Sequence, residues 1–464
     1  MPLKFVFGPS GSGKSTYLYQ HVIEESEKYP LKNFIVLVPE QFTMQTQKDL
    51  VSMHPRHGIM NIDVLSFARL AYRVFEETGT KQMQVLDDEG KNLILRKIAG
   101  DYENKLTVLK GNIKKLGYIS EVKSVISEFT QYDIGEEEMD EMLDHLDEDS
   151  RLYYKLKDIR LLYEGFQDYL RERYITKEEL LDVLNSQVKE SELLKNSVVV
   201  LDGFTGFTPV QNRLILELMR CCKEVWVTVT MDERENPYAY KHPYQLFGLS
   251  KQMVTTLVRM AGENHIEVEE PVCLYGYPVK RFEKNQELAF LERNIFRYGS
   301  GRYDKAVENL EIHAAGNPRQ EADAVAEGIR RLVRKEQYRY RDIGVIVSDM
   351  NVYGDYLEQA FENYGIPVFM DHKRSILLNS FVEYIRSLLN MAEKNFSYES
   401  VFRFLRTNLA GFACEEVDEL ENYVLGLGIR GYKGWQNRWI RRLKGMEEEE
   451  LDRLNHYRVQ LVEK

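Results

Sequence analysis

An eight-residue segment near the N-terminus, GPSGSGKS at residues 8–15, constrains the fold of this chain more than any other feature. An apolar, strand-like run at residues 3–7 precedes it, and a helix-like stretch at residues 16–27 follows it. The spacing G-x-x-x-x-G-K-S between a strand and a helix is that of a P-loop, whose backbone N–H groups surround phosphate oxygens at a helix N-terminus. The sequence therefore predicts a nucleotide-binding α/β domain at the start of the chain.

Each residue of this segment is a candidate ligand of ATP. We expect the Lys14 ammonium to reach the β- and γ-phosphates, and the Ser15 hydroxyl to ligate the accompanying Mg²⁺. The backbone around them would hold the remaining phosphate oxygens. The full predicted set is Gly8, Pro9, Ser10, Gly11, Ser12, Gly13, Lys14 and Ser15.

Composition sets the broad class of the protein. A chain of 464 residues that is 43% hydrophobic is expected to fold into two or three domains with substantial cores. No apolar run approaches the roughly 18 residues that a membrane span needs, so we expect a cytoplasmic protein without membrane contact. The four cysteines show no CxxC spacing, so the sequence supports neither a zinc site nor a disulfide framework.

The net charge of −12 argues against binding of polyanions over the whole surface, but local basic segments remain. One such segment contains Arg438, Trp439, Arg441 and Arg442. These residues could grip phosphates with an aromatic ring among them, and a solvated helix face explains the same pattern equally well.

Apolar runs alternate with helical patterns along much of the chain, which is typical of parallel sheets flanked by helices. The expected strands are residues 3–7, 34–38, 62–65, 198–201, 225–230, 310–313 and 343–347. Residues 84–195 contain no convincing strand and are interpreted as a helical insertion that divides a first α/β domain into residues 1–83 and 196–300. Residues 301–464 are expected to form part of a second α/β domain that becomes helical from residue 381 and stops within a helix.

Asp202 follows the buried run 198–201, where P-loop nucleoside triphosphatases place the carboxylate that holds Mg²⁺. Aspartate is also common in turns after strands, so its role depends on the P-loop. The next residue is Gly203, although an active enzyme usually has glutamate there to orient the attacking water. Positioned general bases contribute about 10² to 10⁴ in rate, so the site is expected to bind ATP far better than it hydrolyses it.

Four segments in this order resemble superfamily 1 helicases of the UvrD type: GPSGSGKS (8–15), IVLVPEQFTMQTQ (35–47), NIDVLSFARLAYRVF (61–75) and LDGFTGFTPVQ (201–211). They look still more like the AddB (RexB) family, the second subunits of bacterial AddAB helicase–nucleases. Residues 317–333 and 338–371 are similar to the second RecA-like domain of that family. The resemblance implies RecA-like parallel sheets in the UvrD architecture, interrupted by a helical insertion.

The resemblance also implies a single-stranded DNA path along residues 39–45 and 66–72, which in the AddB family is associated with recognition of the Chi recombination hotspot. For each aromatic residue on this path, packing in the core is the alternative. The residues that the resemblance implies as contacts to this DNA include two from the loop after Asp202 that would stack on bases. The full set is Gln41, Thr43, Phe67, Arg69, Tyr72, Phe204 and Phe207.

The chain also departs from an active helicase. UvrD-type enzymes have Asp-Glu-x-Gln where this sequence continues from Asp202 with Gly203, Phe204 and Thr205, and their later arginine-bearing segment is not recognisable here. The resemblance implies ATP and Mg²⁺ as cofactors, with an AddA subunit and DNA ends as partners. The family's C-terminal nuclease and 4Fe–4S cluster are expected outside residues 1–464.

These observations lead to one main hypothesis and two alternatives. The main one is an ATP-binding, DNA-guiding subunit of a helicase/deoxyribonuclease for double-strand-break repair, without motor activity of its own. The first alternative is an active superfamily 1 helicase, which vigorous DNA-stimulated ATP turnover would reveal. The second is a P-loop kinase for small molecules, which would transfer phosphate without DNA.

Overall fold

The computed structural model of the chain describes residues 2–79, 84–112, 115–171, 174–297, 299, 301–371 and 375–463. The described residues form two compact units, Met1–Glu311 and Ile312–Lys464. None of the helices in this part of the chain combines the length and the apolar character that crossing a bilayer requires.

A six-stranded sheet organises the first unit, with the strand order β3-β2-β6-β7-β1-β8 among the described residues. All of its strand pairs are parallel, so the carboxyl ends of the strands lie along one edge. Five predicted strands are confirmed, and β8 is additional. The strands are β1 (Leu3–Gly8), β2 (Asn33–Leu37), β3 (Ile62–Leu65), β6 (Ser197–Leu201), β7 (Glu224–Thr230) and β8 (Val272–Cys273).

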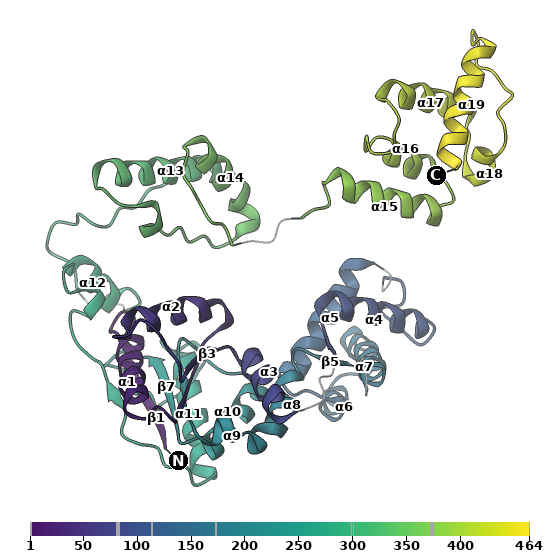
Figure 1. Cartoon of the computed structure of the whole chain (residues 1–464). Helices are drawn as coiled ribbons and strands as arrows, with labels where there is room; N and C mark the ends of the chain where they lie inside the picture. Colours follow the sequence, from purple (N-terminus) through teal and green to yellow (C-terminus); the bar gives the residue numbers. More distant parts are fainter. Residues whose placement is uncertain are drawn as a thin grey trace. The chain divides into compact units, whose positions relative to one another are not determined.

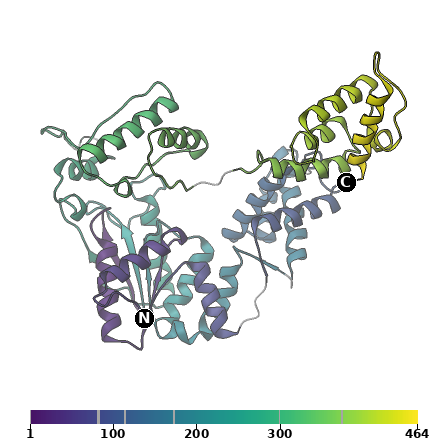
Figure 2. The same cartoon turned by 45° about the horizontal axis from the view of Figure 1, so that its top comes forward.

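Both faces of this sheet are buried, because successive strand residues point to opposite sides. Val6 and Val36 pack with α1 (Lys14–Lys28) and α2 (Thr43–Met53), whereas Phe5 and Leu37 belong to the core on the other face. Figure 1 shows α1 and α2 together, and Figure 2 shows the strands between these purple helices and the teal helices of the other layer. That layer contains α3 (Phe67–Thr78), α8 (Leu180–Gln187), α10 (Pro209–Cys221) and α11 (Gly248–Glu263).

Between α3 and β6, four helices share a separate core: α4 (Asp88–Asp101), α5 (Leu116–Gln131), α6 (Glu136–Asp144) and α7 (Arg151–Leu170). The prediction that no strand occurs here is wrong, because β4 (Gln84–Leu86) and β5 (Tyr174–Thr176) pair in parallel. Strands of three residues are too short to show a period. Further along, Leu184 of α8 and Leu194 of α9 (Glu192–Lys195) pack in the core of the large sheet.

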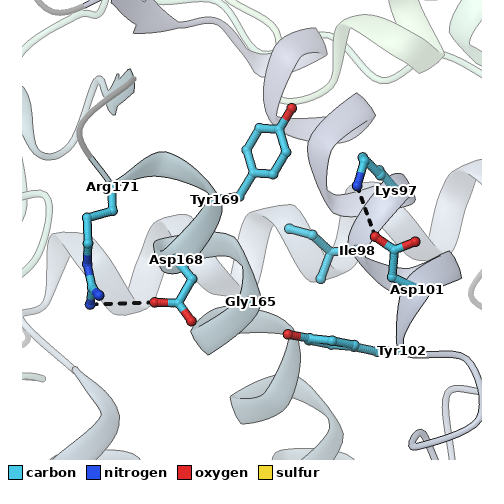
Figure 3. A pocket seen from close by; sticks show the side chains of 8 residues that line it. All are labelled: Lys97, Ile98, Asp101, Tyr102, Gly165, Asp168, Tyr169 and Arg171. Atoms are coloured by element: carbon cyan, nitrogen blue, oxygen red, sulfur yellow. Dashed lines mark hydrogen bonds and ion pairs between the residues drawn. The ribbon is translucent and has the colours of Figure 1, made fainter.

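Helices α4 and α7 approach each other closely at Gly165 (Figure 3). A Cβ atom at Gly165 would lie 2.6 Å from Cε2 of Tyr102 and 2.9 Å from Cγ2 of Ile98. The adjoining cavity, about 640 Å³, is lined by charged residues that pair with each other. Lys97 bonds Asp101 at 3.0 Å, and Arg171 lies 3.5 Å from Asp168, so these charges are already neutralised by neighbours.

We predict that Gly165→Ala lowers the free energy of unfolding by about 1–3 kcal/mol, because the added methyl group overpacks the contact between α4 and α7. Urea unfolding measures this. Gly100→Ala is the matched control, since Gly100 also lies in a helix but a Cβ atom there meets nothing within 4 Å. The control should be neutral or stabilising by up to about 1 kcal/mol. Equal effects of the two substitutions would contradict the close packing at Gly165.

In the second unit, α13 (Pro318–Lys335) and α14 (Met350–Asn363) pack around a small apolar cluster. The strands predicted at 310–313 and 343–347 are wrong, because the chain there has no sheet partner within the described residues. A strand exists only when a neighbour accepts its hydrogen bonds. Ile312 and Ile346 are 100% and 98% exposed, whereas Ile343 and Val347 are partly buried against the small apolar cluster.

The helical prediction for the end of the chain is confirmed. Five helices enclose a core that contains the fully buried Trp435. They are α15 (Ser380–Glu393), α16 (Tyr398–Leu405), α17 (Cys414–Leu427), α18 (Gly431–Gln436) and α19 (Glu448–Val462).

Candidate functional site

The glycine-rich loop between β1 and α1 depends on glycine at several positions. Gly11 and Gly13 have φ angles of +83° and +92°, in the left-handed region that only glycine adopts freely. A side chain at Gly8 would place its Cβ 2.4 Å from Oγ of Ser12. The loop therefore turns tightly from the sheet into α1, and its backbone is accessible from the carboxyl edge of the sheet.

The N-terminus of α1 has the properties of an anion site. Its cap residue is Gly13, so no side chain accepts from the first amide groups, and the first turn contains no acidic residue. The Ser12 hydroxyl is buried without a hydrogen-bond partner among the described residues. That hydroxyl lies against Gly8, so the free amides and the helix dipole are the features that favour a bound oxyanion.

Lys14 lies at this helix start with its ammonium group turned back onto the loop. Its Nζ atom donates to the carbonyl oxygens of Gly8 and Pro9, both at 2.9 Å. Burial lowers the pKa of Lys14 to about 8; attraction by Asp202 opposes this shift and the Arg281 charge adds to it. A phosphate group in the loop would relieve that burial cost by pairing with the ammonium.

Asp202 stands at the end of β6 and is 5% exposed. Its two carboxylate oxygens accept hydrogen bonds from different elements: Tyr19 of α1 donates at 2.7 Å and Thr228 of β7 at 2.6 Å. The Tyr19 hydroxyl also lies 3.3 Å from Oγ1 of Thr46 on α2. The carboxylate is thus fixed in place, and a chain of hydrogen bonds connects it to α2.

Gly203, at the position where an active helicase has glutamate, has a φ angle of +79°. A glutamate in this backbone conformation would be strained. Asp202 is the one acidic residue among the described residues that line the adjoining cavity. Asp232, after β7, does not line it; although burial would raise the pKa of Asp232, hydrogen bonds from Arg234 lower it to about 2.

The cavity, about 490 Å³, lies against the glycine-rich loop, the ends of β6 and β7, and the short helix η3 (Lys280–Phe282). Sequence reasoning missed Lys280 and Arg281 in η3. Strand β8 pairs with β1, and η3 follows it, so the backbone N–H of Arg281 donates to Gly11 at 3.0 Å. The two residues of β8 are too short a run to predict a strand, but the adjacent Lys-Arg pair was a visible signal.

The residues predicted to contact single-stranded DNA differ in how accessible they are. Gln41, in the short helix η1 (Glu40–Phe42), Arg69 and Tyr72 are exposed at the carboxyl ends of β2 and β3. Thr43 is buried, and its hydroxyl donates to the carbonyl of Glu40 at 3.0 Å, so it fixes the start of α2.

The three predicted aromatic contacts near the end of β6 form one cluster. Phe67 is 8% exposed, with its ring 5.4 Å from that of Phe204. The rings of Phe204 and Phe207 are 5.2 Å apart, and both are partly exposed. Phe67 therefore packs in the core and supports the other two rings, whose outer surfaces remain accessible.

Comparison with known proteins identifies the family. A family profile described as "ADDB, N-terminal" matches residues 5–292. The chain belongs to the AddB family. It is 44% identical, over 99% of its length, to a protein from Lachnoclostridium phytofermentans that carries the name of the B subunit of an "ATP-dependent helicase/deoxyribonuclease". Proteins of the same name from Caldanaerobacter subterraneus subsp. tengcongensis and Clostridium novyi are 37% and 33% identical over 96% and 100% of the chain.

The chain spans about 40% of the length of these AddB relatives: 40%, 38% and 40% of the three proteins named above. The resemblance found in the sequence is therefore confirmed as family membership.

We predict that nucleotide affinity falls above about pH 8, by about tenfold per pH unit. In the protein without nucleotide, Lys14 is protonated below this pH, and its ammonium group pairs with phosphate directly. Above it, the lysine must take up a proton on binding, so the affinity decreases. Calorimetric titration with Mg–ATP from about pH 7.5 to about pH 9.5 measures the effect. Lys14→Met should bind weakly with no dependence on pH in this range; the same decline in that variant would contradict the assignment to Lys14.

Proposed function

We propose that the first unit is a RecA-like domain of the UvrD type whose P-loop binds Mg–ATP. The observation that carries this proposal is the convergence of Lys14, Asp202 and an uncapped, glycine-dependent helix start on one cavity. Lys280 and Arg281 add positive charge at the same cavity. An anion with several negative charges, such as a triphosphate, matches this distribution.

The residues present also fit Mg²⁺. Ser15 and Asp202 line the same cavity and offer oxygen ligands, which Mg²⁺ prefers. Each carboxylate oxygen of Asp202 accepts one hydroxyl group and retains a further lone pair for a metal-bound water. The ion would neutralise phosphate charge, while Lys14 and the loop amides orient the phosphates.

We further propose that this site binds ATP without functioning as a motor. Active enzymes of this type usually orient the attacking water with a second carboxylate, and Asp202 itself is held by Tyr19 and Thr228. The cavity offers none among the described residues that line it. The conformation of Gly203 supports the same conclusion, because this position accommodates no ordinary side chain without strain.

We predict that Gly203→Glu fails to create DNA-stimulated ATP turnover and lowers the free energy of unfolding by about 1–2 kcal/mol, because the left-handed backbone penalises the new side chain. Steady-state phosphate release and urea unfolding measure the two effects. Gly206→Glu, in the same loop but in open space and without a positive φ, is the matched control and should retain stability. Appearance of turnover in Gly203→Glu would show that only the side chain was missing.

The second part of the proposal is a path for single-stranded DNA along the carboxyl ends of β2 and β3. Arg69 would contact a phosphate or base and Gln41 a base edge or phosphate, while Tyr72 stacks. Phe204 and Phe207 lie between this edge and the nucleotide cavity and present partly exposed rings. The hydrogen bonds from Asp202 through Tyr19 to Thr46 support communication between the two sites.

We predict that Arg69→Ala weakens single-stranded DNA binding by about 1–3 kcal/mol, that is about 5- to 150-fold, because it removes an exposed cation from this path. Fluorescence anisotropy with a labelled oligonucleotide measures the affinity. Arg73→Ala removes a cation one turn further along α3, where Arg73 lies 3.9 Å from Glu76, and should have little effect. Equal losses in both variants would indicate general electrostatics, and no loss in either would exclude α3 from the path.

In the whole protein, we propose that this chain serves as the helicase-like part of an AddB subunit. It would act with an AddA partner on DNA ends in the cytoplasm during double-strand-break repair, and scan the strand for Chi. The relatives' name, that of one lettered subunit of a "helicase/deoxyribonuclease", supports a partner subunit and action on DNA. Residues 301–464 would contribute to a second RecA-like domain, and the nuclease with its 4Fe–4S cluster would lie outside this chain. An active helicase is disfavoured because the described residues that line the cavity include no carboxylate besides Asp202, and a small-molecule kinase is disfavoured by the match to the AddB profile.

A further inference from the structure

A basic segment near the end of the chain contributes no residue to the proposed ATP site or to the proposed path for single-stranded DNA. Residues 422–446 contain six Lys or Arg residues and no Asp or Glu, although the chain as a whole carries a net charge of −12. The six are Arg430, Lys433, Arg438, Arg441, Arg442 and Lys444.

The part of this segment between α18 and α19 is extended and follows the side of α19 (Figures 1 and 2). The interpretation of residues 438–442 as a helix face is therefore wrong. Asn455 of α19 accepts from the backbone N–H of Trp439 and donates to its carbonyl, both at 2.9 Å. Arg458 donates to the carbonyls of Trp435 and Gln436 at 2.8 Å. These buried bonds hold the segment in one conformation.

The segment has an inner and an outer side. Trp439 is 7% exposed and Leu443 packs against Gly426, where an added Cβ would lie 2.8 Å from a Leu443 methyl carbon. Trp439 is therefore a core residue and does not stack on a ligand. The intervening side chains face solvent: Ile440 is 81% exposed, and Arg441, Arg442 and Lys444 are also exposed.

The outer cations differ in whether an acidic residue neutralises them. Arg438 pairs with Asp452 at 3.1 Å. Arg441, Arg442 and Lys444 have no acidic partner within the part of the chain that the structure describes. Acidic residues resume only at the start of α19, where Glu447–Glu450 follow the segment. Three unpaired cations on a fixed backbone form a local positive surface on an acidic protein.

We propose that Arg441, Arg442 and Lys444 form a second DNA-binding surface that contacts backbone phosphates. This proposal rests on the proposed function in one respect, namely that DNA is the polyanion that the protein binds. Phosphate contacts by Lys and Arg need no base readout and release counterions, so their energy depends strongly on salt. Three exposed, unpaired cations held by one rigid segment match this mode of binding.

The test compares this 464-residue chain with the triple variant Arg441→Gln, Arg442→Gln and Lys444→Gln. The matched control is Arg334→Gln, Lys335→Gln and Lys394→Gln, which removes the same charge from exposed positions elsewhere in the second unit. Affinity for a labelled duplex and for the matching single strand is measured over a series of salt concentrations. Urea unfolding checks that both variants remain folded.

The proposal expects the negative slope of log K against log[salt] to fall in magnitude, by about 3 for duplex or by about 2 for single-stranded DNA, in the triple variant only. Unchanged slopes for both DNA forms, or an equal fall in the control, would overturn it. If the triple variant still binds DNA but no longer associates with a partner subunit, the segment is a protein-binding surface, and the proposal is also overturned. If Arg69→Ala weakens binding while the triple variant does not, this inference fails and the proposed function stands; absence of DNA binding by the unmodified chain contradicts both.

Discussion

Parallel pairing of β1, β7 and β6 is the constraint on which the candidate site depends. Gly8 at the end of β1 is in register with Thr230 of β7, and Leu201 of β6 with Val227, so the loops that follow these strands meet at one edge. That edge brings Asp202 to the glycine-rich loop across a sequence separation of nearly 190 residues. Strands β2 and β3 continue the same parallel sheet, so the proposed path for single-stranded DNA lies beside the proposed nucleotide site.

The electrostatics of the cavity distinguish binding from catalysis. Lys14, Lys280 and Arg281 supply positive charge, and a single carboxylate, already bonded to two hydroxyl groups, opposes it. This charge distribution favours the binding of phosphates, and the described lining residues include no second carboxylate that could activate water. This imbalance is the basis of the proposal that the site binds ATP without functioning as a motor.

Much of this organisation could be predicted, because strands such as 198–201 are apolar and continuous and the loop at residues 8–15 carries a specific spacing. The failures have physical causes. Residues 310–313 and 343–347 are apolar, but no neighbour pairs with them among the described residues, and composition does not report partners. The predicted DNA contacts of Thr43 and Phe67 stay predictions; both side chains are buried, which sequence spacing alone does not report. Arg281 was missed because its place beside Gly11 arises from tertiary pairing of β8 with β1.

The central claim, nucleotide binding without motor activity, is tested most directly by measuring Mg–ATP binding and ATP hydrolysis on the same preparation of this chain, with and without single-stranded DNA. The account predicts saturable binding of ATP with turnover that stays at background in the presence of DNA. DNA-stimulated turnover that disappears in Lys14→Met would contradict it, because this cavity would then activate water although Asp202 is the one acidic residue among its described lining residues.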